Sequence, residues 1–113
     1  MTRIEAFSKL GGPSFVRDLV SLFVSGGQST LARLRALIAA NDHAVLRKEA
    51  HALKGSALNL GAVRCARAAQ ELEQAASAND AARWTPLLTA LESELGEASA
   101  ALERIARDIV PPA

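Results

Sequence analysis

Residues 84–109 read WTPLLTALESELGEASAALERIARDI and carry the clearest apolar periodicity in the chain. Apolar side chains recur there at alternating steps of four and three residues, namely Trp84, Leu88, Leu91, Leu95, Ala98, Leu102, Ile105 and Ile109. This spacing is typical of the seam of a helix that lies in a bundle. The sequence therefore predicts a long helix anchored in the core by Trp84, with Pro86 tolerated in its first turn and Pro111-Pro112 ending it.

Three further helical segments precede this one, separated by turn-forming residues. They are predicted over residues 14–40, 42–60 and 63–78. Gly26-Gly27 interrupts the first segment but leaves its apolar phase intact, so we expect one continuous helix there. Asp42 is expected to cap the second segment, and Gly61 is expected to end it in a left-handed conformation.

A short helix is expected at the N-terminus, where Ile4, Phe7 and Leu10 repeat at helical spacing. Gly11 would close it, and Pro13 would open the next helix at its first position. Four main helices with short connections favour antiparallel neighbours. The predicted fold is all-α: an up-down-up-down antiparallel four-helix bundle in a single domain, residues 1–113, with the short N-terminal helix capping one end.

Composition excludes several classes of function. The chain has 13 basic and 12 acidic residues, so no overall field draws it to nucleic acid or to an anionic membrane. Its apolar runs are shorter than the ~20 residues that span a bilayer. Cys65 is the only cysteine, which favours a reducing compartment. We expect a cytoplasmic protein that contacts neither nucleic acid nor membrane, and nothing in the sequence demands more than a monomer.

The segment after Asp42 carries the most informative polar residue. Its apolar stripe comprises Leu46, Ala50, Leu53, Ala57 and Leu60. At about 100° per residue, His51 projects roughly 140° away from the centre of that stripe. We therefore expect the His51 ring to face solvent midway along the helix.

The residues one turn from His51 are Arg47 and Lys48 on one side and Lys54 and Gly55 on the other. Nearby cations favour the neutral, nucleophilic imidazole and would partly neutralise a phosphoryl group bound to it. A glycine in mid-helix costs roughly 1 kcal/mol relative to alanine, so Gly55 suggests that a partner needs space beside the ring.

The run HALKGSALNLGA, residues 51–62, resembles the signature of histidine-containing phosphotransfer (HPt) domains. That signature has a histidine, a Lys-Gly pair three and four residues later, and a Leu-Gly that closes the helix. The similarity extends to Leu10-Gly11-Gly12, to residues 15–19 and to Leu72-Glu73.

The resemblance implies that His51 accepts a phosphoryl group through Nε2, that Lys54 steadies the group and that Gly55 admits the partner. Glu73 lies where some members have a glutamine that bonds the histidine, and it would orient the ring. Arg47 and Lys48 would contact the partner, and apolar docking contacts are expected from Ala44, Leu58, Phe7 and Leu10.

The implied partners are response-regulator receiver domains and a hybrid sensor histidine kinase, of which this chain could be the soluble C-terminal domain. Magnesium is expected on the receiver, and no cofactor is expected on this chain. The sequence has no phosphate-binding glycine loop, so the chain is interpreted as a phosphocarrier rather than an enzyme.

Two other functions stay open from the sequence. One is a bundle that only binds a partner, with His51 unused. The other is the phosphoacceptor domain of a chemotaxis-type histidine kinase, whose donor is ATP. His43 lacks a following Lys-Gly pair and is interpreted as plain surface, and the Glu-x-x-His pairs of di-iron bundles are absent.

Overall fold

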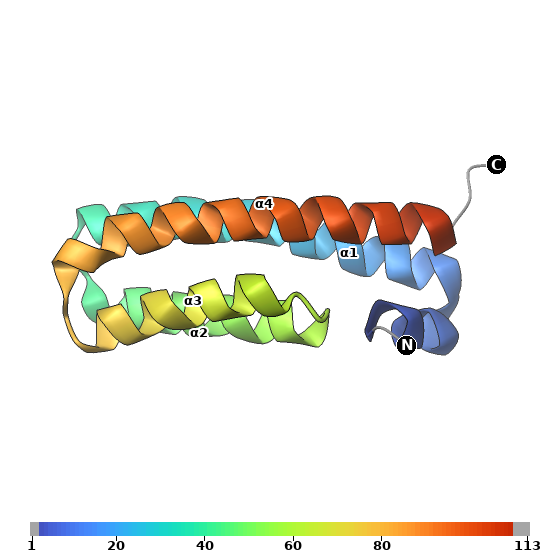
Figure 1. Ribbon diagram of the computed structural model, residues 1–113, viewed down its shortest axis with the longest axis horizontal. Helices are drawn as coiled ribbons and strands as arrows, with labels where there is room; N and C mark the ends of the chain where they lie inside the picture. The colour runs from blue at the N-terminus through green and yellow to red at the C-terminus, as the bar shows by residue number, and fades with distance from the viewer. Residues whose placement is uncertain (1–2, 110–113) are drawn as a thin grey trace.

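The computed structural model describes residues 3–109, with side chains for residue 12 and residues 14–108. The elements follow in the order α1 (Arg3–Ala39), α2 (His43–Asn59), α3 (Val63–Ser77), the 3₁₀ turn η1 (Ala81–Arg83) and α4 (Trp84–Ile109). Within these residues there is no strand. α1 and α4 lie side by side along the molecule, and α2 and α3 form a second layer against them (Figure 1).

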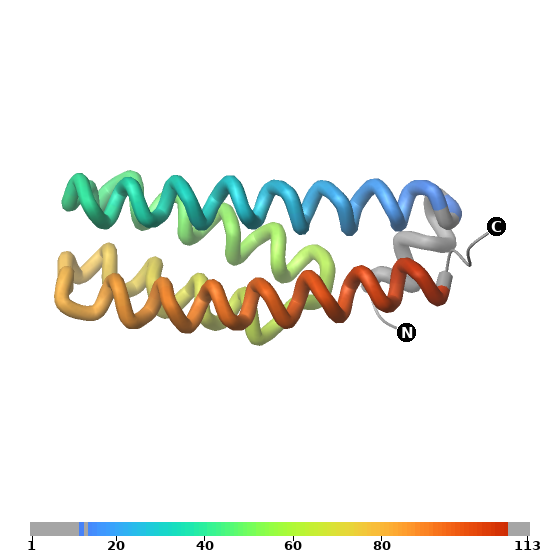
Figure 2. The backbone as a smooth tube through the Cα atoms, turned by 90° about the horizontal axis from the view of Figure 1, so that it is seen from above, coloured from blue at the N-terminus to red at the C-terminus, as the bar shows by residue number. Residues whose placement is uncertain are grey.

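The four helices pack in a ring in which each contacts the next, and α4 closes the ring against α1. This arrangement confirms the predicted up-down-up-down bundle. α2 and α3 have 17 and 15 residues, whereas α1 and α4 have 37 and 26. The two short helices therefore cover only the part of the α1–α4 pair that lies nearest the α1–α2 and α3–α4 turns (Figure 2).

The first three helices end in the same hydrogen-bonded turn. In each of them the residue that follows the C-cap adopts a left-handed conformation. These residues are Asn41 at φ 55°, Gly61 at φ 78° and Asn79 at φ 54°. The next backbone N–H then donates to a carbonyl five residues back, at 3.0, 2.8 and 3.0 Å respectively. Glycine and asparagine adopt this conformation most readily. The predicted role of Gly61 is confirmed, and the Val45 N–H donates to Asp42 Oδ1 at 3.3 Å, which confirms the predicted cap.

The break near the N-terminus falls one residue later than predicted. Gly12, and not Gly11, has the non-helical conformation, with φ 80° and ψ −179°. Pro13 follows Gly12, and proline disfavours the α conformation in the residue before it. The side chains of Phe7 and Leu10 lie outside those described, so the capping of one bundle end by residues 3–11 stays a prediction.

The core confirms most of the predicted faces. All five residues of the predicted α2 stripe are buried. On α4 the predicted seam is buried or partly buried through Ile105, whereas the side chain of Ile109 lies outside those described. Ser99 and Ala106 are also buried, so the buried face of α4 is wider than a single seam. Trp84 anchors the start of α4 as predicted, and its indole N–H donates to the Ala75 carbonyl at 3.1 Å.

Small side chains bring α2 and α3 together. The buried face of α2 contains Ala50 and Ala57, and most of the buried residues of α3 are also alanines. These two helices approach each other more closely than the other neighbouring pairs do. This close approach places polar residues at the outer edges of α2 and α3 within hydrogen-bond distance.

Gly27 has a packing role that Gly26 lacks. A Cβ atom at Gly27 would lie 3.0 and 3.1 Å from the two δ-carbons of Leu95, whereas a Cβ at Gly26 would meet nothing within 4 Å. Leu95 is fully buried, so it would have to shift within the core to accommodate a Cβ atom at Gly27. Gly27 therefore permits the close contact between α1 and α4.

Replacement of each glycine by alanine separates packing from helix propensity. Both substitutions gain about 1 kcal/mol of helix propensity. We expect Gly26→Ala to raise the free energy of unfolding, and Gly27→Ala to be less stable than Gly26→Ala by about 1–3 kcal/mol because of overpacking. Urea unfolding of the two variants measures the difference, and equal stabilities would show that Leu95 yields without cost.

Candidate functional site

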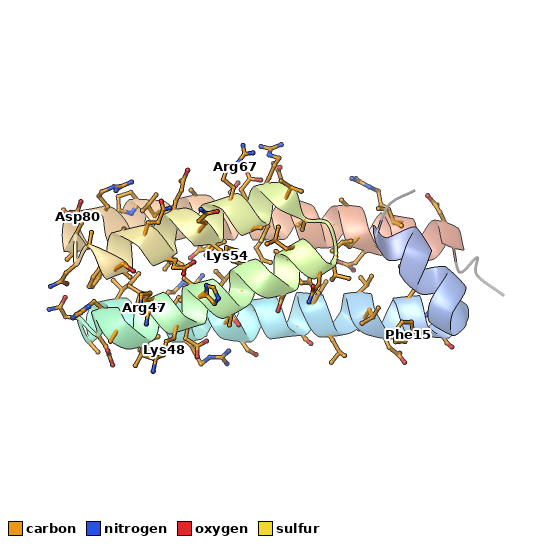
Figure 3. The ribbon with its side chains drawn as sticks, turned by 90° about the horizontal axis from the view of Figure 1, so that it is seen from below. Phe15, Arg47, Lys48, Lys54, Arg67 and Asp80 are labelled. Atoms are coloured by element: carbon orange, nitrogen blue, oxygen red, sulfur yellow. The ribbon has the colours of Figure 1, made fainter. Side chains whose placement is uncertain are left out.

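His51 projects from the middle of α2 into solvent. Its side chain is 63% exposed, which confirms the orientation predicted from helical phase. Arg47 and Lys48 lie one helical turn before it, and Lys54 and Gly55 lie one turn after it. Lys54 lies between α2 and α3, whereas Arg47 and Lys48 lie nearer the start of α2 (Figure 3).

One ring nitrogen of His51 is held by α3. The Nδ1 atom lies 2.8 Å from Glu73 Oε2. An ionised carboxylate accepts hydrogen bonds and cannot donate, so Nδ1 must carry the proton. In the neutral ring the lone pair is then on Nε2. The contact therefore fixes the orientation of the ring and leaves Nε2 as the nucleophilic nitrogen.

The second oxygen of the same carboxylate binds Lys54. The Nζ atom lies 3.1 Å from Glu73 Oε1, and the side chains of Lys54 and Glu73 are only 22% and 17% exposed. One carboxylate therefore joins an exposed imidazole to a sheltered ammonium group. We call these three residues the His51–Glu73–Lys54 cluster.

The cluster keeps Glu73 ionised. Partial burial is the largest single influence on this group and opposes ionisation. Hydrogen bonds and charge from Lys54 and His51 together outweigh it, so the pKa of Glu73 lies below its ordinary value. Glu73 is accordingly a carboxylate at neutral pH, as the assignment of the Nδ1 proton requires.

The space beside the ring is open. A Cβ atom at Gly55 would meet nothing within 4 Å. Arg47, Lys48 and Ala44 are exposed, and Arg47 and Lys48 form no ion pair with any side chain that the structure describes. Leu58 is 45% exposed. These residues thus form an accessible surface around His51, while Phe7 and Leu10 lie outside the described side chains.

One feature of the site was missed in the sequence. A shallow depression lies on the α3 side of the cluster, lined in part by Gln70, Gln74 and Ser77. The glutamines lie one turn or one residue from Glu73, so they could have been included once α3 was placed beside α2.

His43 and a metal site are the other candidates that the sequence raises. His43 is exposed at the first position of α2. Between residues 3 and 109 no group of three or more His, Cys, Asp or Glu side chains is placed to hold a metal ion. None of the helices in that range has the length and apolar character needed to cross a bilayer.

Comparison with known proteins assigns the family. The chain matches the Hpt domain over residues 18–104, a range that contains α2, α3 and the whole cluster. It therefore belongs to the Hpt family, whose members carry out histidine phosphotransfer in phosphorelays. The resemblance read from residues 51–62 is confirmed.

A solved structure is similar in fold over nearly the whole length. The crystal structure of histidine-containing phosphotransfer protein B from Pseudomonas aeruginosa PAO1 superposes with a TM-score of 0.86. The two sequences are 25% identical, and the match covers 94% of this chain and 91% of that chain. No curated protein matches the chain in sequence.

The lowered pKa of Glu73 predicts how stability depends on pH. In the unfolded chain the pKa of a glutamate is about 4.3, so ionised Glu73 favours the folded state above that pH. This contribution is lost as the pH falls through the lower folded-state pKa. We expect urea unfolding between pH 7 and pH 3 to show a steeper acid loss of stability in wild type than in Glu73→Gln.

Glu71→Gln is the matched control for this measurement, because Glu71 is exposed on the same helix. It should keep the acid slope of the wild-type protein. Parallel curves for wild type and Glu73→Gln would show that the cluster contributes nothing to folding.

Proposed function

We propose that His51 accepts a phosphoryl group from the aspartyl phosphate of one receiver domain and passes it to the aspartate of another. The observation that carries this proposal is the exposed ring whose Nδ1 is held by Glu73 at 2.8 Å, in a chain of the Hpt family. Nε2 of this ring is accessible and oriented before any partner arrives, and in the neutral ring it carries the lone pair.

The transfer is an in-line displacement at phosphorus. The Nε2 lone pair attacks, the N–P bond forms as the P–O bond to the donor aspartate breaks, and the aspartate leaves as a carboxylate. The Nδ1 proton stays in its hydrogen bond to Glu73. In the return transfer the acceptor carboxylate attacks, and the ring leaves as neutral imidazole with that proton in place.

The charged residues around the ring have separate roles in this scheme. The phosphoryl group brings about two negative charges. Lys54 is sheltered and already oriented by Glu73, so it can steady the group at little conformational cost. Arg47 and Lys48 are exposed and unpaired among the described side chains, so they suit contacts to the acidic active site of a receiver.

The partner completes the reacting assembly. The magnesium that phosphoryl transfer requires is expected on the receiver, and this chain supplies the nucleophile and a docking surface. Ala44 and Leu58 lie on the His51 side of α2 and are proposed as apolar contacts. Phe7 and Leu10, whose side chains lie outside those described, are proposed as further contacts. We propose that the chain acts in the cytoplasm as a monomer or as the C-terminal domain of a hybrid sensor histidine kinase.

The assignment of His51 is tested by label transfer from a receiver. Wild type, His51→Gln and the control His43→Gln are incubated with a receiver that carries radiolabelled aspartyl phosphate. We expect label on wild type and on His43→Gln, and none above background on His51→Gln. Label retained by His51→Gln would refute the site. No label on wild type would refute transfer from the receiver, and it would favour either a binding function or a phosphoacceptor domain supplied by a kinase.

The clearance at Gly55 is tested by adding bulk there. Gly55→Gln and the control Gly96→Gln both replace an exposed mid-helix glycine whose Cβ would meet nothing within 4 Å. Each should stabilise the fold by about 0.5 kcal/mol through helix propensity. Only Gly55→Gln should slow transfer from the receiver, by up to about a hundredfold if the reacting groups are displaced by an ångström. Equal rates would remove the need for a glycine.

A further inference from the structure

Glu73 differs from a glutamine in one property that matters for the ring beside it. A carboxylate only accepts hydrogen bonds, whereas an amide can either accept or donate. Both oxygens of Glu73 have a partner: Oε2 accepts a hydrogen bond from His51 Nδ1, and Oε1 forms an ion pair with Lys54 Nζ at 3.1 Å. The side chain is 17% exposed, so solvent does not readily replace either contact. Glu73 therefore presents a fixed acceptor to Nδ1.

This constraint applies equally after His51 has been phosphorylated. With a phosphoryl group on Nε2, Nδ1 carries either a proton or a lone pair. A lone pair on Nδ1 would face the Glu73 carboxylate with no hydrogen between them, and the carboxylate would lose its charge-assisted bond. The charged side chains around the ring are Arg47, Lys48 and Lys54 on α2 and Glu73 on α3. Of these four, only Glu73 contacts Nδ1, so it has the strongest influence on whether Nδ1 keeps its proton.

The proton on Nδ1 decides how well the phosphoryl group leaves. A ring that keeps this proton departs as neutral imidazole. A ring without it must depart as an imidazolate anion, which is a far poorer leaving group. The protonated phosphohistidine is therefore the more reactive donor.

We propose that Glu73 is a positioning residue that retains the proton on Nδ1 of phosphorylated His51, and so keeps the phosphohistidine short-lived and efficient as a donor. The inference deepens the proposed function, because it concerns the outward transfer from the same ring. Lys54 assists by binding the other oxygen of Glu73 at 3.1 Å.

Glu73→Gln removes this constraint while keeping the size of the side chain. The amide can turn its NH₂ group toward a bare Nδ1, so the phosphorylated ring is free to lose its proton. We expect the phosphohistidine of Glu73→Gln to persist about tenfold longer than that of wild type at pH 8, the factor given by the lower end of charge-assisted hydrogen-bond strength. Glu71→Gln, with the same change of charge on the exposed side of α3, should match wild type.

The experiment uses potassium phosphoramidate, a small N–P donor, so that no receiver has to be identified. Decay of the phosphohistidine is followed by ³¹P NMR, and the Nδ1 proton is detected from the ¹⁵N shifts of the phosphorylated ring. The proposal expects a protonated Nδ1 in wild type and a bare Nδ1 with slow decay in Glu73→Gln. Equal lifetimes, or a bare Nδ1 in wild type, would overturn it.

The two proposals fail in different ways. If phosphoramidate labels His51 but no receiver does, the relay function fails while the role of Glu73 can still be measured. If a receiver labels His51 and Glu73→Gln decays like wild type, the role of Glu73 fails and the relay function stands.

Discussion

The hydrogen bond between His51 Nδ1 and Glu73 Oε2 joins α2 to α3 at 2.8 Å, and the chemistry of the site depends on it. It determines which nitrogen is protonated, which nitrogen faces solvent and how the ring is turned. It also couples the exposed histidine to Lys54 through the second oxygen of the same carboxylate. Without this hydrogen bond the ring would rotate freely at the surface among cations, and either nitrogen could act as the nucleophile. A short contact between two helices thus orients an exposed histidine in the way that the proposed phosphotransfer requires.

The fold provides this contact by holding α2 and α3 close together in a fixed register. Alanines on their buried faces permit the close approach. Only Leu60, Gly61 and Ala62 connect the helices, and the left-handed Gly61 sets the turn, so the register between His51 and Glu73 has little freedom. The long α1–α4 pair supports both helices from behind, with Gly27 allowing that pair to pack closely at Leu95. Stability lies in the buried layer, and the outer face of α2 is left free for a partner.

The features that belong to a single helix could be predicted from the sequence, because apolar periodicity shows which face of each helix is buried. The α2 stripe, the exposure of His51, the Asp42 cap and the left-handed Gly61 all follow from local geometry. The ion pair between Lys54 and Glu73 could not be derived from the geometry of one helix, because it depends on the register between α2 and α3. The position of the N-terminal break was misjudged because the effect of Pro13 on Gly12 outweighs the order of the two glycines. Gln70 and Gln74 were missed for the same reason as the Lys54 contact.

Glu73 occupies Nδ1 of His51, and we propose that it thereby directs phosphorylation to Nε2. A ¹H–³¹P correlation spectrum of the phosphorylated protein distinguishes the two nitrogens, because the attached nitrogen determines which ring protons couple to phosphorus. We expect three-bond couplings from phosphorus to both Hδ2 and Hε1 of His51, which is the pattern of an Nε2 linkage. A three-bond coupling to Hε1 alone would place the phosphoryl group on Nδ1 and refute the proposed role of Glu73.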